Sequence, residues 1–357
     1  MAHSGSRYLV LSTFLLGTLS LCGQAVQGSA SSRVLIDNDG TVQMPAQAVP
    51  PSEFLSPEAK AYVAQHLREM QDPEILKQDN GVPRFMKPML HRDYELFAVD
   101  RKDEAIGGVH VYDYRPKSGI QKQNQTRILI NLHGGGFSGC WPGCAELESI
   151  PVAATMDIRV VSIDYREGPA YKFPAASEDV ASVYRELLKT YKPGAIGIYG
   201  CSAGGMLTAM SVAWFQTHGL PRPGAIGIYC ASAGRFGGDA SFVALPLGEA
   251  RIAGHSGHRG VQLGYLSDAD PNDPMVSPVT SKSILAKFPP TLLITGDRDF
   301  AFSGAINTDI QLSGVGVETE LHMWDGLFHG FFYNPDVPES KDAFAIMSRF
   351  FDRHLEK

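Results

Sequence analysis

A serine stands in the segment Gly200-Cys201-Ser202-Ala203-Gly204, directly after the apolar run AIGIY and directly before a long apolar stretch. In a strand–turn–helix context, a G-x-S-x-G sequence lifts the serine hydroxyl above the end of a sheet, and small flanking residues avoid a collision with the neighbouring strand and helix. Ser202 is therefore the candidate nucleophile. The alternative is a chance occurrence of the five residues at a glycine-rich strand end, and the partners described below favour the catalytic interpretation.

A second segment of the chain closely resembles this one. PGAIGIYGCSAG at 193–204 is repeated as PGAIGIYCASAG at 223–234. No third copy exists, so we interpret the two copies as neighbouring parallel strands of one buried sheet rather than as a repeat architecture. Cys230 replaces Gly200 in the second copy, and Ser232 therefore lacks the small residue that the sharp turn requires.

Three consecutive glycines follow another apolar run, in His133-Gly134-Gly135-Gly136-Phe137. Glycines after a strand leave backbone N–H groups unshielded, and such groups can converge on a developing oxyanion. A flexible turn is the alternative, but the G-x-S-x-G sequence downstream favours an oxyanion loop. Gly135 and Gly136 are the candidate donors, and Ala203, which follows the nucleophile, supplies a third N–H.

A hydroxyl nucleophile requires a base, and eleven histidines are available. His329 lies in DGLFHGFF, after the last predicted strand and before the last predicted helix, which is where the chain order Ser, Asp, His places the base. His255 and His258 stand close together in a Gly-rich stretch, but no third ligand at useful spacing favours a metal site there, and surface or cap positions explain them better.

The orienting carboxylate is expected at the end of the run PTLLIT, in Gly296-Asp297-Arg298-Asp299. Both aspartates are reachable from the strand end, although positions two apart in a tight turn cannot both face the same histidine. We favour Asp299, and expect Asp297 to cap or pair locally.

Extended and helical segments alternate around these residues, which predicts a mainly parallel eight-stranded sheet with helices on both faces. Helices are predicted at 56–70, where Ser56 caps and Pro57 opens the first turn, and at 176–191 and 203–218. The predicted strands are 95–99, 108–114, 127–132, 159–165, 195–200, 225–230, 290–295 and 318–324.

The remaining segments define the expected domain organisation. Residues 1–25 combine a basic residue, a short apolar run and small residues, the pattern of a secretory signal peptide; an N-terminal anchor helix and lipidation at Cys22 are weaker alternatives. Residues 26–93 form a helical N-terminal segment, 94–357 the catalytic domain, and 235–278 an insertion above the sheet. We expect an exported protein without a stable membrane span in its mature form.

Composition narrows the class of partner. The 357 residues carry 31 Lys and Arg against 38 Asp and Glu, a net charge of -7, so nothing favours binding of nucleic acid or anionic membranes. Five cysteines are too few for a disulfide scaffold. Cys140 and Cys144 follow the glycine loop and could bridge in an oxidising compartment, or remain free thiols. Cys201 and Cys230 are expected to be buried without a catalytic role.

Six segments in order resemble the hormone-sensitive-lipase-like branch of the α/β-hydrolases, from about Tyr94 to the C-terminus. They are HGGGF at 133–137, DYREGPAYKFPAASED at 164–179, GCSAGG at 200–205, DPMVSP at 273–278, GDRD at 296–299 and DGLFHGF at 325–331. The resemblance implies an α/β-hydrolase fold with a helical cap, formed here by the residues before Pro88 and by 235–278. The sequence departs from the family pattern at two places. Cys201 stands where Asp or Thr is usual, and residues 166–169 read REGP where the family usually has a hydrophobic run.

The resemblance also implies a serine esterase that acts mostly on short acyl chains and needs no metal or organic cofactor. The family's acid stands three residues after the strand-end glycine, which supports Asp299. Ser202, Asp299 and His329 would then form the catalytic triad, acting on a small-molecule ester. A lactone or carbamate is the alternative substrate. A non-catalytic receptor like the similar gibberellin receptors is disfavoured, because those proteins have lost the base.

Overall fold

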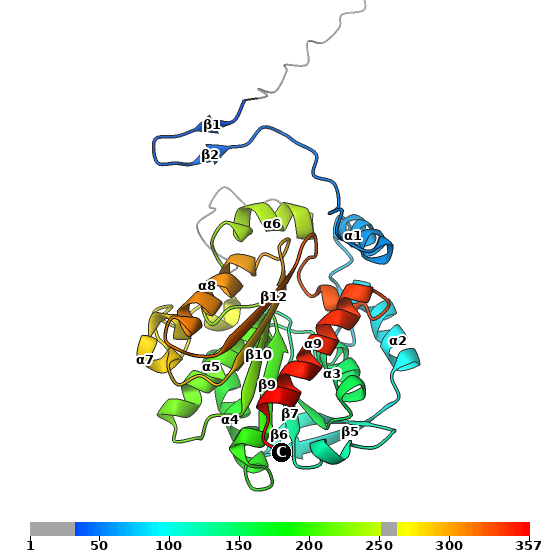
Figure 1. The fold of residues 1–357 in the computed structure, drawn as a ribbon, viewed down its shortest axis with the longest axis vertical. Helices are drawn as coiled ribbons and strands as arrows, with labels where there is room; N and C mark the ends of the chain where they lie inside the picture. Colours follow the sequence, from blue (N-terminus) through cyan, green and yellow to red (C-terminus); the bar gives the residue numbers. More distant parts are fainter. Residues whose placement is uncertain (1–32, 251–262) are drawn as a thin grey trace, which may run out of the picture. The chain divides into compact units, whose positions relative to one another are not determined.

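Eight strands form one sheet in the order β12-β11-β10-β9-β7-β8-β6-β5 (Figure 1). The computed structural model describes residues 33–250 and 263–357. The neighbours from β12 through β8 pair in parallel, whereas β6 pairs antiparallel with β8 and with the edge strand β5. The strands of this sheet are β5 (Val99–Ile106), β6 (Val109–Pro116), β7 (Ile128–Leu132), β8 (Val160–Ile163), β9 (Ile196–Cys201), β10 (Ala225–Tyr229), β11 (Thr291–Gly296) and β12 (Thr319–Trp324).

Helices cover both faces of this sheet, as the alternating pattern predicts. The helices are α1 (Pro57–Glu69), α2 (Lys87–Leu96), α3 (Gly143–Met156), α4 (Ala175–Leu187), α5 (Ala203–Thr217), α6 (Ala240–Glu249), α7 (Lys282–Leu285), α8 (Phe302–Ser313) and α9 (Pro338–His354). Helices α3 and α9 pack on one face, and α4, α5 and α8 on the other (Figure 1).

Side chains of the central strands belong to two hydrophobic cores, one on each face of the sheet. On β7, Ile128 and Ile130 join the core under α4 and α5, whereas Leu129 joins the core under α3 and α9. All three side chains are fully buried. Strands buried on both faces carry continuous apolar runs, which is why the central strands are readable from sequence.

The predicted strand at 95–99 is wrong. Residues 87–96 are helical in α2, and the edge strand β5 begins only at Val99. Its sequence is VDRKDEAI, and residues 100–103 are all exposed. An edge strand that is largely solvated lacks the alternation of apolar and polar residues, so its sequence does not distinguish it from a loop.

The predicted helices are confirmed. Helix α1 begins after Ser56, whose Oγ accepts the backbone N–H of Ala59 at 3.0 Å, and α4 and α5 lie within the predicted ranges 176–191 and 203–218 to within a residue at their starts. Within 235–278, where no strand is expected, α6 is the long element described. The signal-peptide pattern at 1–25 and the histidines 255 and 258 lie outside the described residues.

The contacts divide the chain into two units, Met1–Val49 and Pro50–Lys357. The described part of the first unit holds a short antiparallel pair, β1 (Leu35–Ile36) with β2 (Val42–Gln43), and a second short pair, β3 (Gln78–Asp79) with β4 (Val82–Pro83), belongs to the second unit. Across residues 33–250 and 263–357, no helix has the length and apolar character needed to cross a bilayer.

Candidate active site

Ser202 sits on a strained turn between β9 and α5. Its backbone has φ 56° and ψ −122°, a conformation that L-residues rarely adopt. A Cβ atom at Gly200 would lie 2.1 Å from the carbonyl oxygen of Leu132, and one at Gly204 would lie 1.7 Å from the same atom. The turn can therefore form only with glycine at both positions, as the G-x-S-x-G spacing predicts.

The second copy of this segment forms a different turn. Its strand β10 is the parallel neighbour of β9, with Ile226 opposite Ile198, as predicted. Cys230 has φ 47°, and the next helix after β10, α6, begins only at Ala240. Ser232 is 2% exposed, and its Oγ donates to the carbonyl oxygen of Gly234 at 2.7 Å. The hydroxyl of Ser232 is thus buried and hydrogen-bonded to the backbone.

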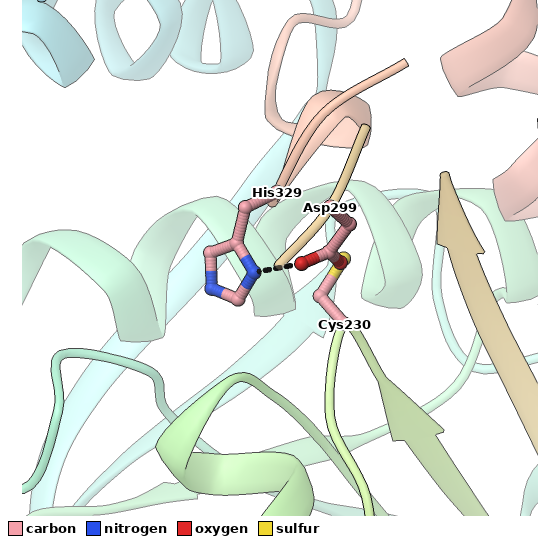
Figure 2. Close-up of side chains that lie close together, drawn as sticks. All are labelled: Cys230, Asp299 and His329. Carbon is pink, nitrogen blue, oxygen red and sulfur yellow. Dashed lines mark hydrogen bonds and ion pairs between the residues drawn. The ribbon is translucent and has the colours of Figure 1, made fainter. Parts of the chain in front are cut away.

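His329 and Asp299 lie in direct contact. His329 Nδ1 is 2.8 Å from Asp299 Oδ1, and Figure 2 shows the imidazole and the carboxylate joined by this bond. Asp299 is fully buried, and it also accepts the N–H of Ala301 at 2.8 Å and the hydroxyl of Thr295 at 3.0 Å. Asp297 instead accepts the N–H of Gly326 at 2.7 Å, from the loop after β12 and 29 residues away, so the expected local pairing of Asp297 is wrong.

The contact changes the pKa of both groups. Burial disfavours a charge on His329, but the Asp299 carboxylate more than offsets this effect and raises the pKa of His329 to about 9. Burial likewise opposes the charge of Asp299, yet the adjacent imidazole and the N–H of Ala301 hold the pKa of Asp299 below its usual value. The ring of Phe300 stacks on His329 with centroids 4.2 Å apart.

The glycine loop leaves the sheet beside the serine turn. Strands β7 and β9 are parallel neighbours, with Leu132 opposite Gly200, so the loop after β7 and Ser202 emerge at the same edge. Gly135 and Gly136 have φ of 116° and 66°. Within the described residues, neither glycine donates its backbone N–H to an acceptor. These two N–H groups are available to a ligand.

Ala203 is the first residue of α5, and the first N–H groups of a helix have no intrahelical acceptor. The structure thus brings the serine, the glycine loop and the His329–Asp299 pair to the carboxyl edge of the parallel strands. No hydrogen bond joins Ser202 Oγ to His329 or to any other described residue. In unliganded sites such bonds are commonly long and tighten when substrate binds.

Glu148 on α3 also belongs to this site, although none of the sequence motifs above indicates it. This residue is 2% exposed, and its carboxylate accepts hydrogen bonds from the backbone N–H groups of Gly134 and Cys201. Burial raises the pKa of Glu148 to about 7, and the hydrogen bonds oppose the rise. The local signal is two acidic residues, Glu146 and Glu148, next to the run SIPVAATM, and it does not distinguish which of them meets the glycine loop.

Cys230 also contacts the His329–Asp299 pair. One possible metal-ligand atom from each of Cys230, Asp299 and His329 lies within 4.8 Å of the other two (Figure 2). This is the one group of three possible metal ligands found within residues 33–250 and 263–357. Thiol, imidazole and carboxylate are the ligand types of zinc. Here Cys230 Sγ accepts the N–H of Gly330 at 3.2 Å, and the carboxylate is already bonded to protein groups. These hydrogen bonds account for the close approach of the three side chains.

The four cysteines within the described residues form one disulfide and two free thiols. Cys140 and Cys144, which the sequence leaves open, form a disulfide with Cα atoms 5.4 Å apart, directly after the glycine loop. Cys201 and Cys230 are free and buried, as expected.

Known proteins are similar to this chain in sequence and in fold. Residues 129–333, more than half of the chain, match the family model described as alpha/beta hydrolase fold. An acetyl-hydrolase from Streptomyces hygroscopicus is 26% identical over 71% of this chain and 87% of its own length. The crystal structure of esterase E25 superposes with a TM-score of 0.74 at 26% identity, covering 88% of this chain and 99% of the esterase.

A structure of an esterase from the bacterial hormone-sensitive lipase family has the same fold, with a TM-score of 0.71 at 22% identity over 84% of this chain and 99% of the esterase. This likeness shows the shared fold. The family model, the sheet order and the strained serine turn lead to one conclusion: the chain belongs to the alpha/beta hydrolase fold family.

Proposed function

We propose that this protein is a serine esterase that hydrolyses carboxylic esters of small molecules through Ser202, His329 and Asp299. The observation that carries the proposal is the 2.8 Å bond between His329 and a fully buried Asp299, at the sheet edge from which the strained Ser202 also emerges. A buried carboxylate that holds Nδ1 leaves Nε2 as the nitrogen that accepts a proton.

The reaction proceeds in two halves. Ser202 Oγ attacks the ester carbonyl carbon while His329 Nε2 takes the hydroxyl proton, and the C–O bond to the alcohol breaks as that proton passes to the leaving oxygen. Water then attacks the acyl-enzyme, His329 accepts its proton, and the carboxylic acid leaves as the proton returns to Ser202. The Asp299 carboxylate stabilises the imidazolium in both halves.

Backbone N–H groups stabilise the tetrahedral oxyanion. Gly135 and Gly136 have N–H groups without an acceptor in the described residues, and Ala203 contributes the first N–H of α5. Each such donor contributes about 3 kcal/mol to transition-state stabilisation in comparable enzymes.

The substrate class is the finer part of the proposal. An acetyl-hydrolase among the relatives supports acyl chains of short to medium length. The pattern at residues 1–25 supports export to the periplasm or the medium. A lactone is the alternative substrate, because the same residues would open its ring ester.

The central experiment compares two serines. Ser202→Ala is expected to abolish hydrolysis of p-nitrophenyl acetate and labelling by a fluorophosphonate, whereas Ser232→Ala, the matched serine of the second copy, keeps both. Turnover by Ser202→Ala at the wild-type rate contradicts the proposal. A series of p-nitrophenyl esters from two to sixteen carbons, beside a panel of small lactones, then separates esterase, lipase and lactonase.

A further inference from the structure

Glu148 is a buried acid that no step of the proposed mechanism uses. Its carboxylate lies between the two backbone segments that carry the reacting groups. Gly134, which begins the glycine loop, donates its N–H to Oε1 at 2.9 Å. Cys201, which precedes the serine, donates its N–H to Oε2 at 3.3 Å. One carboxylate therefore bridges the glycine loop and the serine turn.

Two side chains complete this set of contacts. Asn131 Nδ2 donates to Oε2 at 2.8 Å, and the Tyr333 hydroxyl donates to Oε1 at 2.8 Å. Tyr333 follows His329 by four residues, so the carboxylate also contacts the segment that carries the histidine. Each oxygen accepts two hydrogen bonds, and all four partners are donors. These four hydrogen bonds favour the ionised carboxylate and oppose the effect of burial, which raises the pKa of Glu148 to about 7.

The backbone that carries Glu148 is itself held against the sheet. The carbonyl oxygen of Glu148 accepts the hydroxyl of Tyr199, a β9 residue, at 2.9 Å. The hydrogen bond from Tyr199 thus fixes this turn of α3 against β9, independently of the contacts that the Glu148 carboxylate makes. Gly134 immediately precedes the oxyanion donor Gly135, and Cys201 immediately precedes Ser202.

We propose that Glu148 is a positioning residue, which sets the distance between the oxyanion donors of the glycine loop and the Ser202 hydroxyl. The glycines have no side chains through which a neighbour could hold them, so a buried acceptor at the first peptide of the loop replaces such contacts. This role rests on the proposed esterase function. Its expected signature is a loss in kcat rather than in KM, because the oxyanion exists only in the transition state.

The chain offers a matched pair of variants for the test. Glu148→Gln keeps the size of the side chain but places an NH₂ group against donors. Glu146→Gln makes the same change two residues earlier on α3, at an acid that is 4% exposed and contacts Tyr94 and Arg101 instead. The measurements are kcat and KM on p-nitrophenyl acetate and the inhibition constant of a trifluoromethyl ketone, which forms an oxyanion on the serine.

For Glu148→Gln we expect kcat and the affinity for the trifluoromethyl ketone to fall together by about 10- to 100-fold, with KM within about 3-fold of wild type. Glu146→Gln should keep all three quantities within about 3-fold of wild type, since its neighbours do not reach the glycine loop. Unchanged kcat in Glu148→Gln, or an equal loss in Glu146→Gln, overturns the positioning role.

Two further variants, Tyr333→Phe and Ser202→Ala, extend the test. If Glu148→Gln does not fold, Tyr333→Phe removes one of the four donors and should lower kcat and ketone affinity by about 3- to 10-fold, and unchanged values overturn the role. If Ser202→Ala retains wild-type turnover, the proposed function fails. That outcome is distinct from a Glu148→Gln enzyme of normal rate beside an inactive Ser202→Ala, which refutes only the role of Glu148.

Discussion

The imidazole of His329 meets the carboxylate of Asp299 at 2.8 Å, and this carboxylate is fully buried with further bonds to Ala301 and Thr295. The protein thus holds this carboxylate through three hydrogen bonds, from His329, Ala301 and Thr295, while the His329 side chain stays 17% exposed. A partner of this kind controls the ionisation of the histidine, because burial alone would lower the pKa of His329 and the carboxylate raises it to about 9.

The pH dependence of activity tests this relationship. A general base acts in its neutral form, so kcat/KM of the wild type should rise with pH up to about 9. Asp299→Asn removes the charge and leaves burial unopposed, so the rise should occur at lower pH and reach a maximum about 10²- to 10⁴-fold smaller. A profile from pH 5 to 10 checks both effects. Asp297→Asn, whose carboxylate bonds Gly326 instead, should keep the wild-type midpoint; an unchanged midpoint in Asp299→Asn would contradict the assignment.

The two glycines that flank the serine turn should tolerate no side chain. Because a Cβ at Gly200 or Gly204 meets the carbonyl oxygen of Leu132 at about 2 Å or less, Gly200→Ala and Gly204→Ala should each lower the free energy of unfolding by about 3 kcal/mol and abolish activity. Gly237→Ala is the control, since an added Cβ there meets no atom within 4 Å. Urea unfolding followed by circular dichroism gives the comparison, and equal stability of all three variants would refute the steric account.

A buried aspartate on α2 should make stability depend on pH. Asp93 is fully buried, neither carboxylate oxygen has a partner among the described residues, and burial together with the charge of Asp336 raises the pKa of Asp93 to about 8. Asp93 therefore keeps a proton in the folded protein. In the unfolded chain, where the pKa of an aspartate is about 3.9, Asp93 releases this proton. Between these two pKa values, rising pH destabilises the wild type by up to about 1.4 kcal/mol per unit.

Asp93→Asn has no carboxyl group to take up this proton. The free energy of unfolding of the variant, minus that of the wild type, should therefore increase from pH 4 to pH 8 and level off above pH 8. Urea midpoints measured across this range test the prediction. Asp100→Asn, on the exposed part of β5, should run parallel to wild type at every pH. A constant difference between Asp93→Asn and wild type would mean that Asp93 is ionised in the folded protein.

The bridge after the glycine loop should contribute modestly to stability. Cys140 and Cys144 close a loop of only a few residues, for which the chain-entropy relation gives about 2 kcal/mol. Replacing both with serine should lower the free energy of unfolding by about this amount. Mass measured after alkylation without reduction establishes the bridge in the protein: two added alkyl groups at these positions would show free thiols and remove the basis for the effect.

The sequence predicts the parts of the molecule whose residues are close together in the chain or carry a strong pattern. The twin segments at 193–204 and 223–234 are continuous apolar runs, and they form adjacent strands as expected. The edge strand β5 is not predicted, because most of its residues are exposed and its charged residues carry no alternation of apolar and polar types. The serine turn is readable because glycine is required there for steric reasons.

Glu148 shows why the rest of the site could not be predicted. Its four partners come from residues 131, 134, 201 and 333, which are brought together only when the sheet has formed. Nothing in the local sequence distinguishes it from Glu146, whose carboxylate turns toward Tyr94 and Arg101. The acid that meets the glycine loop is identified by tertiary packing alone.

The position of β12 at one end of the sheet order has a consequence for the growing polypeptide. His329 follows β12, which among the described strands pairs with β11 alone, whereas Ser202 follows the central strand β9. During synthesis the serine turn and the glycine loop emerge long before the histidine exists. A partly made or C-terminally truncated chain is therefore catalytically silent under the proposed mechanism, and the onset of hydrolysis reports that the whole sheet has been assembled.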